Sequence, residues 1–171
     1  QSQVNDTLNT NISYSYSSLK RTTTKSATSI YDGKINKIDI ENNWRPNSYT
    51  TVIFGADTKT ETGSVDDSWG AFEKTSHTVK GLYTQANFNL DLIAFNAGVR
   101  REYYSGKVNN THSLSISSEI PLTELNIHTN FSTGFRSPSL YERFNANSAN
   151  KELNAESSTS KEISLVSNYF D

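Results

Sequence analysis

Three histidines stand among many serines and aspartates, which is the residue set of a hydrolase: His77, His112 and His128. The sequence contains neither the Gly-x-Ser-x-Gly turn that exposes a nucleophilic serine nor the His-Glu-x-x-His pair of zinc proteases. His128 also shares one face of an alternating segment with Asn126 and Asn130, where hydrogen bonding explains it adequately. We therefore expect no enzymatic activity.

Asp66 and Asp67 are adjacent acids in a polar segment near 60–77. Clustered carboxylate oxygens are the ligands that Ca²⁺ prefers, although adjacent acids in a loop are usually just solvated. Cysteine is absent, which excludes disulfides and thiolate metal sites. We expect no metal or other cofactor, and Asp66 and Asp67 are the candidate ligands if the outer loops bind Ca²⁺.

Aromatic side chains mark two polar segments, near 60–77 and 137–157, and the second is also rich in asparagine. Aromatic rings together with amides can hold a large, partly apolar ligand. The expected ligand-contact residues are Trp69, Phe72, Tyr141 and Phe144. We also expect Leu140, Tyr141 and Phe144 to pack this outer segment against the body of the fold.

The composition is polar for a folded chain of 171 residues, with 33% hydrophobic residues and a mean hydropathy of -0.65. A net charge of -2 leaves no basic footprint for nucleic acid. No apolar run approaches the ~18 residues that a membrane helix requires. Aromatic residues make up 11% of the chain, which argues for ordered structure rather than disorder.

Apolar and polar residues alternate with a period of two in about eight segments, which is typical of half-buried β-strands. The clearest lies near 124–136, where Leu125, Ile127 and Phe131 oppose Asn126 and Asn130. The predicted strands lie near 8–20, 33–44, 49–60, 78–90, 92–103, 111–120, 124–136 and 158–169.

The polar side of these strands carries full charges, among them Lys37, Asp39 and Arg100. Burying so many charges in a dry core would be very costly, whereas a water-filled lumen accommodates them. Aromatic residues near strand ends suit the girdles of a membrane barrel. We expect Tyr103 and Tyr104 to belong to such a girdle, and the alternative is that they contact a ligand from the segment 103–111. The pattern favours an antiparallel transmembrane β-barrel, with a soluble β-sandwich as the alternative.

The expected connections alternate between short and long. Short ones are predicted at 45–48, 89–91 and 120–123, and long ones around 21–32, 60–77, 103–111 and 137–157. Membrane barrels show this asymmetry because tight turns lie on the periplasmic side and longer loops face outward.

Arg136 and Glu162 lie on the polar faces of the two strands that flank the segment 137–157. We expect them to form ion pairs inside the barrel, either with each other or with a domain that fills it. Ordinary charge balance in the lumen is the alternative explanation.

The same region carries a recognisable order of residues: GFRSPSLYERF at 134–144, LNAESS at 153–158 and EISL at 162–165. It resembles a signature of TonB-dependent outer-membrane receptors that reads G-F-R-x-P-x-L-x-E-x-F, then L-x-P-E-x-S, then E-x-G. Ala155 and Ser164 depart from that pattern. YTQ at 83–85 and GVRREYY at 98–104 are similar to two further strands of the family, with Glu102 in place of its usual aspartate.

The resemblance implies active uptake of a scarce nutrient, such as cobalamin or an iron–siderophore complex, across the bacterial outer membrane. It implies a 22-stranded barrel around an N-terminal plug, and the TonB energy complex, outer-membrane lipid and a small nutrient ligand as partners. Nothing in residues 1–171 resembles the plug, so we expect the whole chain to be part of the barrel domain.

An arc of a barrel leaves two unpaired edges, which lipid cannot satisfy. Further strands, expected after Asp171, would supply the missing neighbours. The alternative is a small eight-stranded barrel that closes on itself and has a structural or adhesive role.

Overall fold

The computed structural model describes residues 2–5, 7–24, 27–68, 70–121, 123, 125–147 and 149–167. It consists of strands and one short helix. The strands are β1 (Ser2–Asn5), β2 (Leu8–Thr24), β3 (Thr28–Asn47), β4 (Thr50–Asp66), β5 (Phe72–Leu90), β6 (Ile93–Tyr104), β7 (Lys107–Ile120), β8 (Leu125–Arg136) and β9 (Glu156–Ser167), and helix α1 (Leu140–Phe144) lies between the last two. No helix within the described residues is long and apolar enough to cross a membrane.

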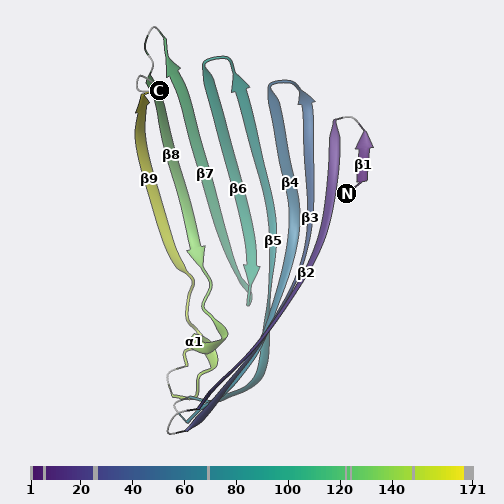
Figure 1. Cartoon of the computed structure of the whole chain (residues 1–171), viewed down its shortest axis with the longest axis vertical. Helices are drawn as coiled ribbons and strands as arrows, with labels where there is room; N and C mark the ends of the chain where they lie inside the picture. Colours follow the sequence, from purple (N-terminus) through teal and green to yellow (C-terminus); the bar gives the residue numbers. More distant parts are fainter. Residues whose placement is uncertain are drawn as a thin grey trace.

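The nine strands form one antiparallel sheet in which each strand pairs with its neighbours in sequence. In Figure 1 the sheet is a twisted, open arc, with β1 and β9 at its opposite edges. Within the described residues these edges do not pair with each other, so the chain does not form the closed eight-stranded barrel that the sequence left as an alternative.

All eight predicted strands are present, but the expected alternation of loop lengths is wrong for three of its four long connections. β2 to β5 extend well beyond the predicted bounds, because threonine and serine pair readily in strands even where neither face is apolar. β6 and β7 meet in a two-residue turn in which Ser105 and Gly106 have φ angles of 48° and 76°, as hairpin turns of this length require. Of these four, the segment 137–155 alone is a long connection in the described structure.

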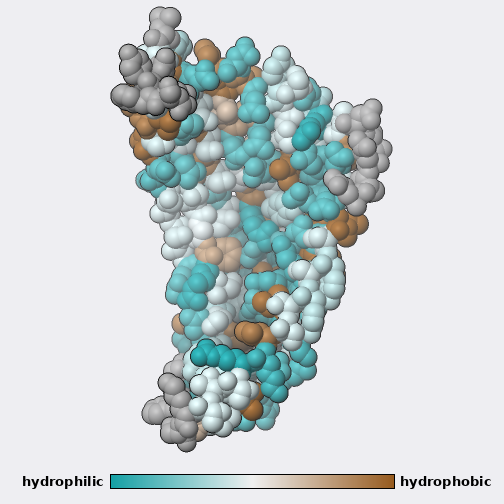
Figure 2. Space-filling view, viewed as in Figure 1, coloured by the Kyte–Doolittle hydropathy of each residue, from teal (hydrophilic) through white to brown (hydrophobic). Residues whose placement is uncertain are grey.

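The strand register separates the two faces of the sheet. Asp39 pairs with Asp57 and Tyr83 with Arg100, so these side chains share one face, which we call the polar face. The opposite, apolar face carries exposed aliphatic and aromatic residues, among them Ile12, Ile38, Ile40, Phe54, Leu82, Ile163 and Leu165. Figure 2 shows one side of the molecule, which is mostly hydrophilic with small hydrophobic patches.

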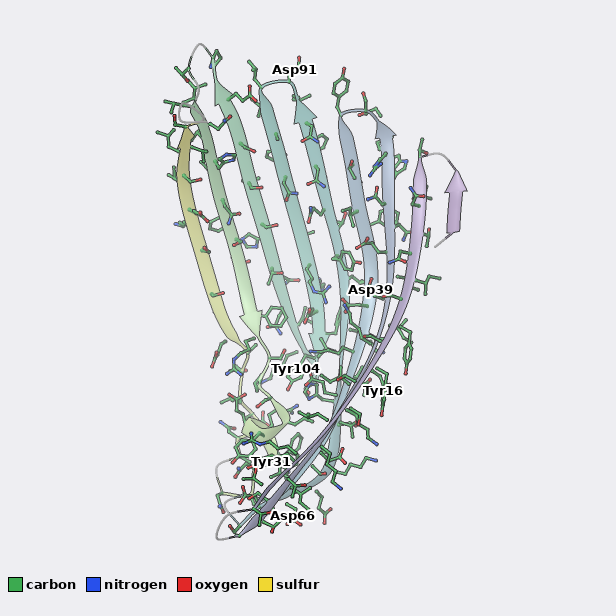
Figure 3. All side chains as sticks on the ribbon, in the orientation of Figure 1. Tyr16, Tyr31, Asp39, Asp66, Asp91 and Tyr104 are labelled. Carbon is green, nitrogen blue, oxygen red and sulfur yellow. The ribbon has the colours of Figure 1, made fainter. Side chains whose placement is uncertain are left out.

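Toward the end of the sheet that carries α1, the polarity of the two faces reverses. The polar face there holds the buried core of the chain, Val65, Val79 and Tyr104, and the side chain of Tyr104 lies beside α1 in Figure 3. The other face is polar at the same level, with Thr60, Thr62 and Ser76. This end therefore resembles a soluble sheet that buries its inner side under a loop.

β7 and β8 separate toward the end of the sheet that carries α1. Their ladder ends at the pair Ser113 and Ser132, although both strands continue. At the next position the side-chain hydroxyl of Thr133, and not its backbone, bonds to the backbone of His112. This hydroxyl accepts from His112 N at 2.9 Å and donates to His112 O at 3.3 Å. The split leaves room beside the loop 137–155.

Lipid contact on the apolar face predicts a position-dependent cost of charge. Phe54→Arg should destabilise the full-length protein by about 2–4 kcal/mol, since a strand arginine near the middle of the bilayer is costly and one near the interface is not. Ser76→Arg, exposed on the same face but beyond the apolar band, is the control and should change stability little. Urea unfolding from lipid vesicles measures both, and equal effects would contradict the assignment.

Candidate functional site

Arg100 is the centre of a charged cluster on the polar face. Its guanidinium contacts Asp57 Oδ2 at 2.7 Å and Glu102 Oε1 at 2.5 Å. It lies over Gly81, where any Cβ would overlap the guanidinium, so only glycine leaves room for it. The ring of Tyr83, 5.6 Å from the guanidinium carbon, completes the packing.

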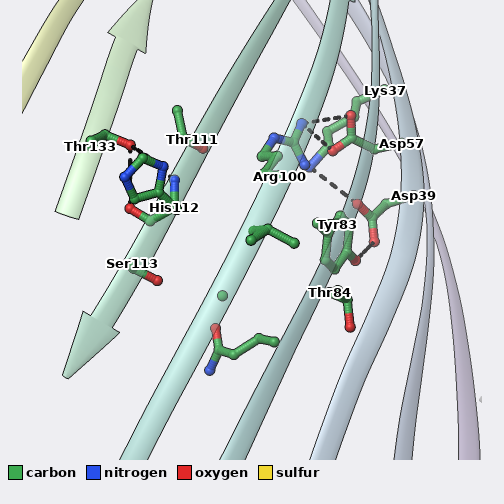
Figure 4. A pocket seen from close by; sticks show the side chains of 13 residues that line it. Lys37, Asp39, Asp57, Tyr83, Thr84, Arg100, Thr111, His112, Ser113 and Thr133 are labelled. Atoms are coloured by element: carbon green, nitrogen blue, oxygen red, sulfur yellow. Dashed lines mark hydrogen bonds and ion pairs between the residues drawn. The ribbon is translucent and has the colours of Figure 1, made fainter. Parts of the chain in front are cut away.

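Tyr83 extends the cluster across β4 to β3. Its hydroxyl donates to Asp39 Oδ1 at 3.3 Å, and Lys37 Nζ lies 3.5 Å from Asp39 Oδ2. Figure 4 shows these side chains converging on the wall of a groove of about 450 Å³. The groove offers paired charges and hydrogen-bonding groups, which suit a wet surface that holds a polar partner.

A second ionic group lies nearer the loop end of the same face. Glu61 contacts Lys59 Nζ at 2.8 Å and His77 Nε2 at 3.3 Å, and the buried His77 stacks edge-on against Tyr104 with their centroids 5.0 Å apart. The hydrogen bond from His77, followed by that from Lys59, lowers the pKa of Glu61 to about 2.

Beyond β8, the chain turns into α1 through a capping box. Ser139 Oγ accepts from Glu142 N at 3.2 Å, while the Glu142 carboxylate accepts from Ser139 N at 2.7 Å. Arg136 binds the same carboxylate at 2.9 Å and that of Glu156 at 2.9 Å, thereby joining β8, α1 and β9. Arg136 first, and then Ser139, lower the pKa of Glu142 to about 2.

The direct ion pair predicted between Arg136 and Glu162 is wrong. Arg136 lies opposite Glu156 in the β8–β9 ladder, whereas Glu162 lies opposite Asn130. This offset of six residues separates the two side chains by roughly 20 Å along the strands. Contact of either residue with a domain inside the barrel stays a prediction.

Helix α1 is fastened to the polar face by Tyr104 and Arg143. The Tyr104 hydroxyl donates to Pro138 O at 3.0 Å, and Arg143 Nη1 donates to that hydroxyl at 3.0 Å and to Ser105 Oγ at 2.9 Å. Asn145, only 1% exposed, closes the helix against Gly70, where a Cβ would overlap its side chain. The loop is thus built into the mouth of the arc.

The sequence of this chain matches, over residues 1–171, the family described as TonB dependent receptor-like, beta-barrel. The chain belongs to this family of outer-membrane receptor barrels. The family is one of non-enzymatic transporters in the bacterial outer membrane, in agreement with the expected localisation and lack of catalysis.

A solved structure shows the same architecture. The siderophore receptor PirA from Pseudomonas aeruginosa superimposes with a TM-score of 0.64 at 19% sequence identity, over 95% of this chain and 40% of that receptor chain. At this identity the likeness concerns the fold alone. No curated protein matches the sequence.

The receptor barrel brings together three of the four predicted ligand-contact residues at its loop end. Phe72 meets Tyr141 edge-to-face with their centroids 6.4 Å apart, and Phe144 lies under Arg143 and Lys151. The expected packing of the loop by Leu140 is also confirmed, since its Cδ1 would lie 3.2 Å from a Cβ at Gly63. Trp69 lies outside the described residues, and ligand contact stays a prediction.

Among the residues that the structure describes, Asp66 and Asp67 do not form a metal centre with other acidic or histidine side chains. Asp67 accepts a hydrogen bond from the Tyr31 hydroxyl at 2.9 Å, and Asp66 is exposed at the end of β4. Within the described residues, no group of three or more His, Cys, Asp or Glu side chains could hold a metal ion. A role for the pair in Ca²⁺ binding stays a prediction.

Sequence reasoning misplaced Tyr104 and missed the anchoring role of Arg143. Tyr104 is 3% exposed on the polar face, so it is not a girdle residue, whereas its neighbour Tyr103 is exposed on the other face. Because β5 and β6 extend beyond the apolar band, Tyr104 lies under the loop 137–155 instead of at the lipid surface. The Ser-x-x-Glu spacing at 139–142 was the available signal for a helix at this position.

The lowered pKa of Glu61 predicts an acid-dependent contribution to stability. Because the folded pKa of about 2 lies below the ordinary 4.5, the contribution is full above pH 4.5 and disappears as the pH falls toward 2. Glu61→Gln should therefore destabilise the full-length protein at pH 6 and converge with wild type near pH 2.

Unfolding midpoints in urea across this pH range test the prediction. Glu73→Gln, which removes an exposed carboxylate from the same hairpin, is the matched control and should parallel wild type. A constant offset between Glu61→Gln and wild type at every pH would contradict the ionic origin of the effect.

Proposed function

We propose that this chain is an arc of the barrel domain of a TonB-dependent receptor, which takes up a scarce nutrient such as cobalamin or an iron–siderophore complex. The main support for this proposal is the position of the loop 137–155 in a barrel wall of this family. The loop lies on the polar face and is held there by Arg136, Tyr104 and Arg143. A loop held in this way restricts the mouth of a wide lumen and presents side chains to a ligand entering it.

The polar face supports a moving partner inside the barrel. The cluster around Arg100 faces water, and Asp57 and Glu102 neutralise the guanidinium. Another domain can therefore move across this surface without leaving a buried charge unpaired. In this proposal a plug, pulled by the TonB energy complex, lies against the groove of Arg100 and Tyr83, and further strands complete a barrel of about 22 strands.

The aromatic residues at the mouth support a ligand with apolar surface. Phe72 and Tyr141 pack at the tip, in reach of the asparagine-rich loop, and both cobalamin and siderophores offer flat apolar groups beside polar ones. The fold likeness to a siderophore receptor is compatible with either ligand class.

Deletion of the whole gene and uptake of labelled nutrients test this function. The deletion strain should lose uptake of either cobalamin or a ferric siderophore, and the full-length gene should restore it only in cells with a working TonB. Unchanged uptake of every such nutrient, or restoration without TonB, would contradict the proposal.

A pair of variants tests the ligand-contact residues within that assay. Phe72→Ala with Tyr141→Ala should raise the half-saturating ligand concentration about tenfold, because aromatic contacts contribute about 0.5–1.5 kcal/mol each. Tyr49→Ala, an exposed tyrosine at the opposite end of the sheet, is the control and should transport like wild type.

A further inference from the structure

The barrel wall is divided between β7 and β8 toward the loop end. The ladder between these strands ends at Ser113 and Ser132. Both strands continue further, β7 from Lys107 and β8 to Arg136. The ladder between β8 and β9, by contrast, continues to the pair of Arg136 and Glu156. The last residues of β8 therefore belong with β9 and not with β7.

Backbone groups of β7 face this gap without a partner in β8. The N–H and C=O of His112 point toward β8, where they bond to the Thr133 hydroxyl. Because backbone groups alternate in direction along a strand, those of Val108 and Asn110 point to the same side. Among the hydrogen bonds between described residues, no backbone bond joins Val108 or Asn110 to β8.

The gap begins where the lipid-facing band ends on these strands. On the apolar face, Leu114 and Ile116 of β7 and Ile163 of β9 are exposed aliphatic residues. The residues that follow on β7 and β9 toward the loop end are polar, namely His112, Asn110, Lys161 and Thr159. Water satisfies the unpaired backbone groups there, whereas lipid could not. The paired ladder below the gap fixes the point from which the strands can separate.

The chain on the far side of the gap is connected within itself. We call this part the flap: residues 133–136 of β8, the loop 137–155 with helix α1, and the start of β9. Arg136 joins β8 to α1 and β9 by binding Glu142 and Glu156, each at 2.9 Å. The flap can therefore move as one body.

Single side-chain contacts hold the flap to the hairpin of β6 and β7. Tyr104 donates to Pro138 O at 3.0 Å and accepts from Arg143 Nη1 at 3.0 Å. Lys107 Nζ donates to Asn154 Oδ1 at 2.7 Å. The tip of the flap rests on β4 and β5 through the packing described above. These contacts can break one at a time, whereas the bonds of a ladder break together.

A polar chamber of about 650 Å³ lies between the base of the flap and the polar face of the sheet. His77 lines it with a side chain that is 6% exposed, and its Nδ1 has no hydrogen-bond partner among the described residues. Thr111 and Thr133, on the two strands that border the gap in Figure 4, also line the chamber. Opening of the gap would therefore open the side of the chamber.

We propose that the flap moves away from β7 about the last ladder pair, Ser113 and Ser132, and thereby opens the chamber to the outside. The Thr133 hydroxyl, Tyr104 and Arg143 hold the closed position. The identity of the solute that the chamber admits rests on the function proposed above, whereas the movement itself does not.

Spin labels on the outer face of the full-length protein in lipid nanodiscs measure the movement. The gap pair, Asn110→Cys with Ser157→Cys, lies across the gap. The ladder pair, Ile116→Cys with Ile163→Cys, lies on the same two strands where both flank Thr129 in an intact ladder. Two ladder spacings amount to roughly 10 Å, a separation at which dipolar broadening of the EPR spectrum is strong.

A release variant, Tyr104→Phe with Arg143→Gln, removes the hydrogen bonds that hold the flap and keeps the buried ring. Dipolar broadening should fall for the gap pair and stay unchanged for the ladder pair. The matched control, Tyr103→Phe with Arg101→Gln, makes the same substitutions at exposed positions of β6 and should alter neither pair. Unchanged broadening of the gap pair, or an equal change in both pairs, would overturn the proposal.

Chemical labelling tests whether the movement opens the chamber. Thr111→Cys in intact cells is treated from outside with a membrane-impermeant maleimide. Its labelling rate should rise about tenfold in the release variant, which corresponds to about 1.4 kcal/mol of lost hydrogen bonding. Ser117→Cys, on the same face of β7 but away from the chamber, is the control and should change little. An unchanged rate at position 111 would overturn the link between flap and chamber.

Each variant is first checked for heat-modifiable migration, so that only folded protein is compared. If the release variant does not fold, Thr133→Val decides, because it removes the hydroxyl and keeps the shape of the side chain. Undiminished broadening of the gap pair in that variant would overturn the proposal. Neither readout depends on uptake, so a failure of the proposed nutrient transport would leave this test intact.

Discussion

One face of this sheet contacts lipid hydrocarbon and the other contacts water. This constraint determines both the pairing of the backbone and the placement of the side chains. Every backbone group within the bilayer must be paired, which the antiparallel ladder from β1 to β9 achieves except at its edges and where β7 and β8 separate. The period of two then places Phe54 and Leu82 toward lipid and Asp57 and Arg100 toward the lumen. The charged cluster on the polar face is possible only because that face is wet.

At the loop end the sheet extends beyond the lipid, so neither face has to contact hydrocarbon. Beyond the apolar band, the outer side of the sheet meets water and becomes rich in threonine and serine. The inner side can then bury Val65, Val79 and Tyr104 against the loop 137–155. Arg136 and Arg143 fix that loop through several partners each, so its position is coupled to the barrel wall.

The strands were predictable wherever one face meets lipid, as in 125–136, because apolar alternation is strongest there. The alternation is lost where β4 extends beyond the lipid-facing band through Thr60, Thr62 and Ser64, so the sequence suggested a loop there. The partners of Arg136 could not be predicted, since they depend on the β8–β9 register and on a helix of five residues. Gly70 and Asn145, distant in sequence, meet only through tertiary packing.

Cysteine accessibility along β7 tests the two-faced barrel wall most directly, and this chain contains no native cysteine. Single cysteines at Ser113, Leu114, Ser115, Ile116 and Ser117 of the full-length protein, in its native membrane, are treated with a membrane-impermeant maleimide. The account predicts labelling of the three serine positions and protection of Leu114 and Ile116, with a period of two. Uniform labelling, or labelling of the leucine and isoleucine positions instead, would contradict a barrel wall between lipid and a water-filled lumen.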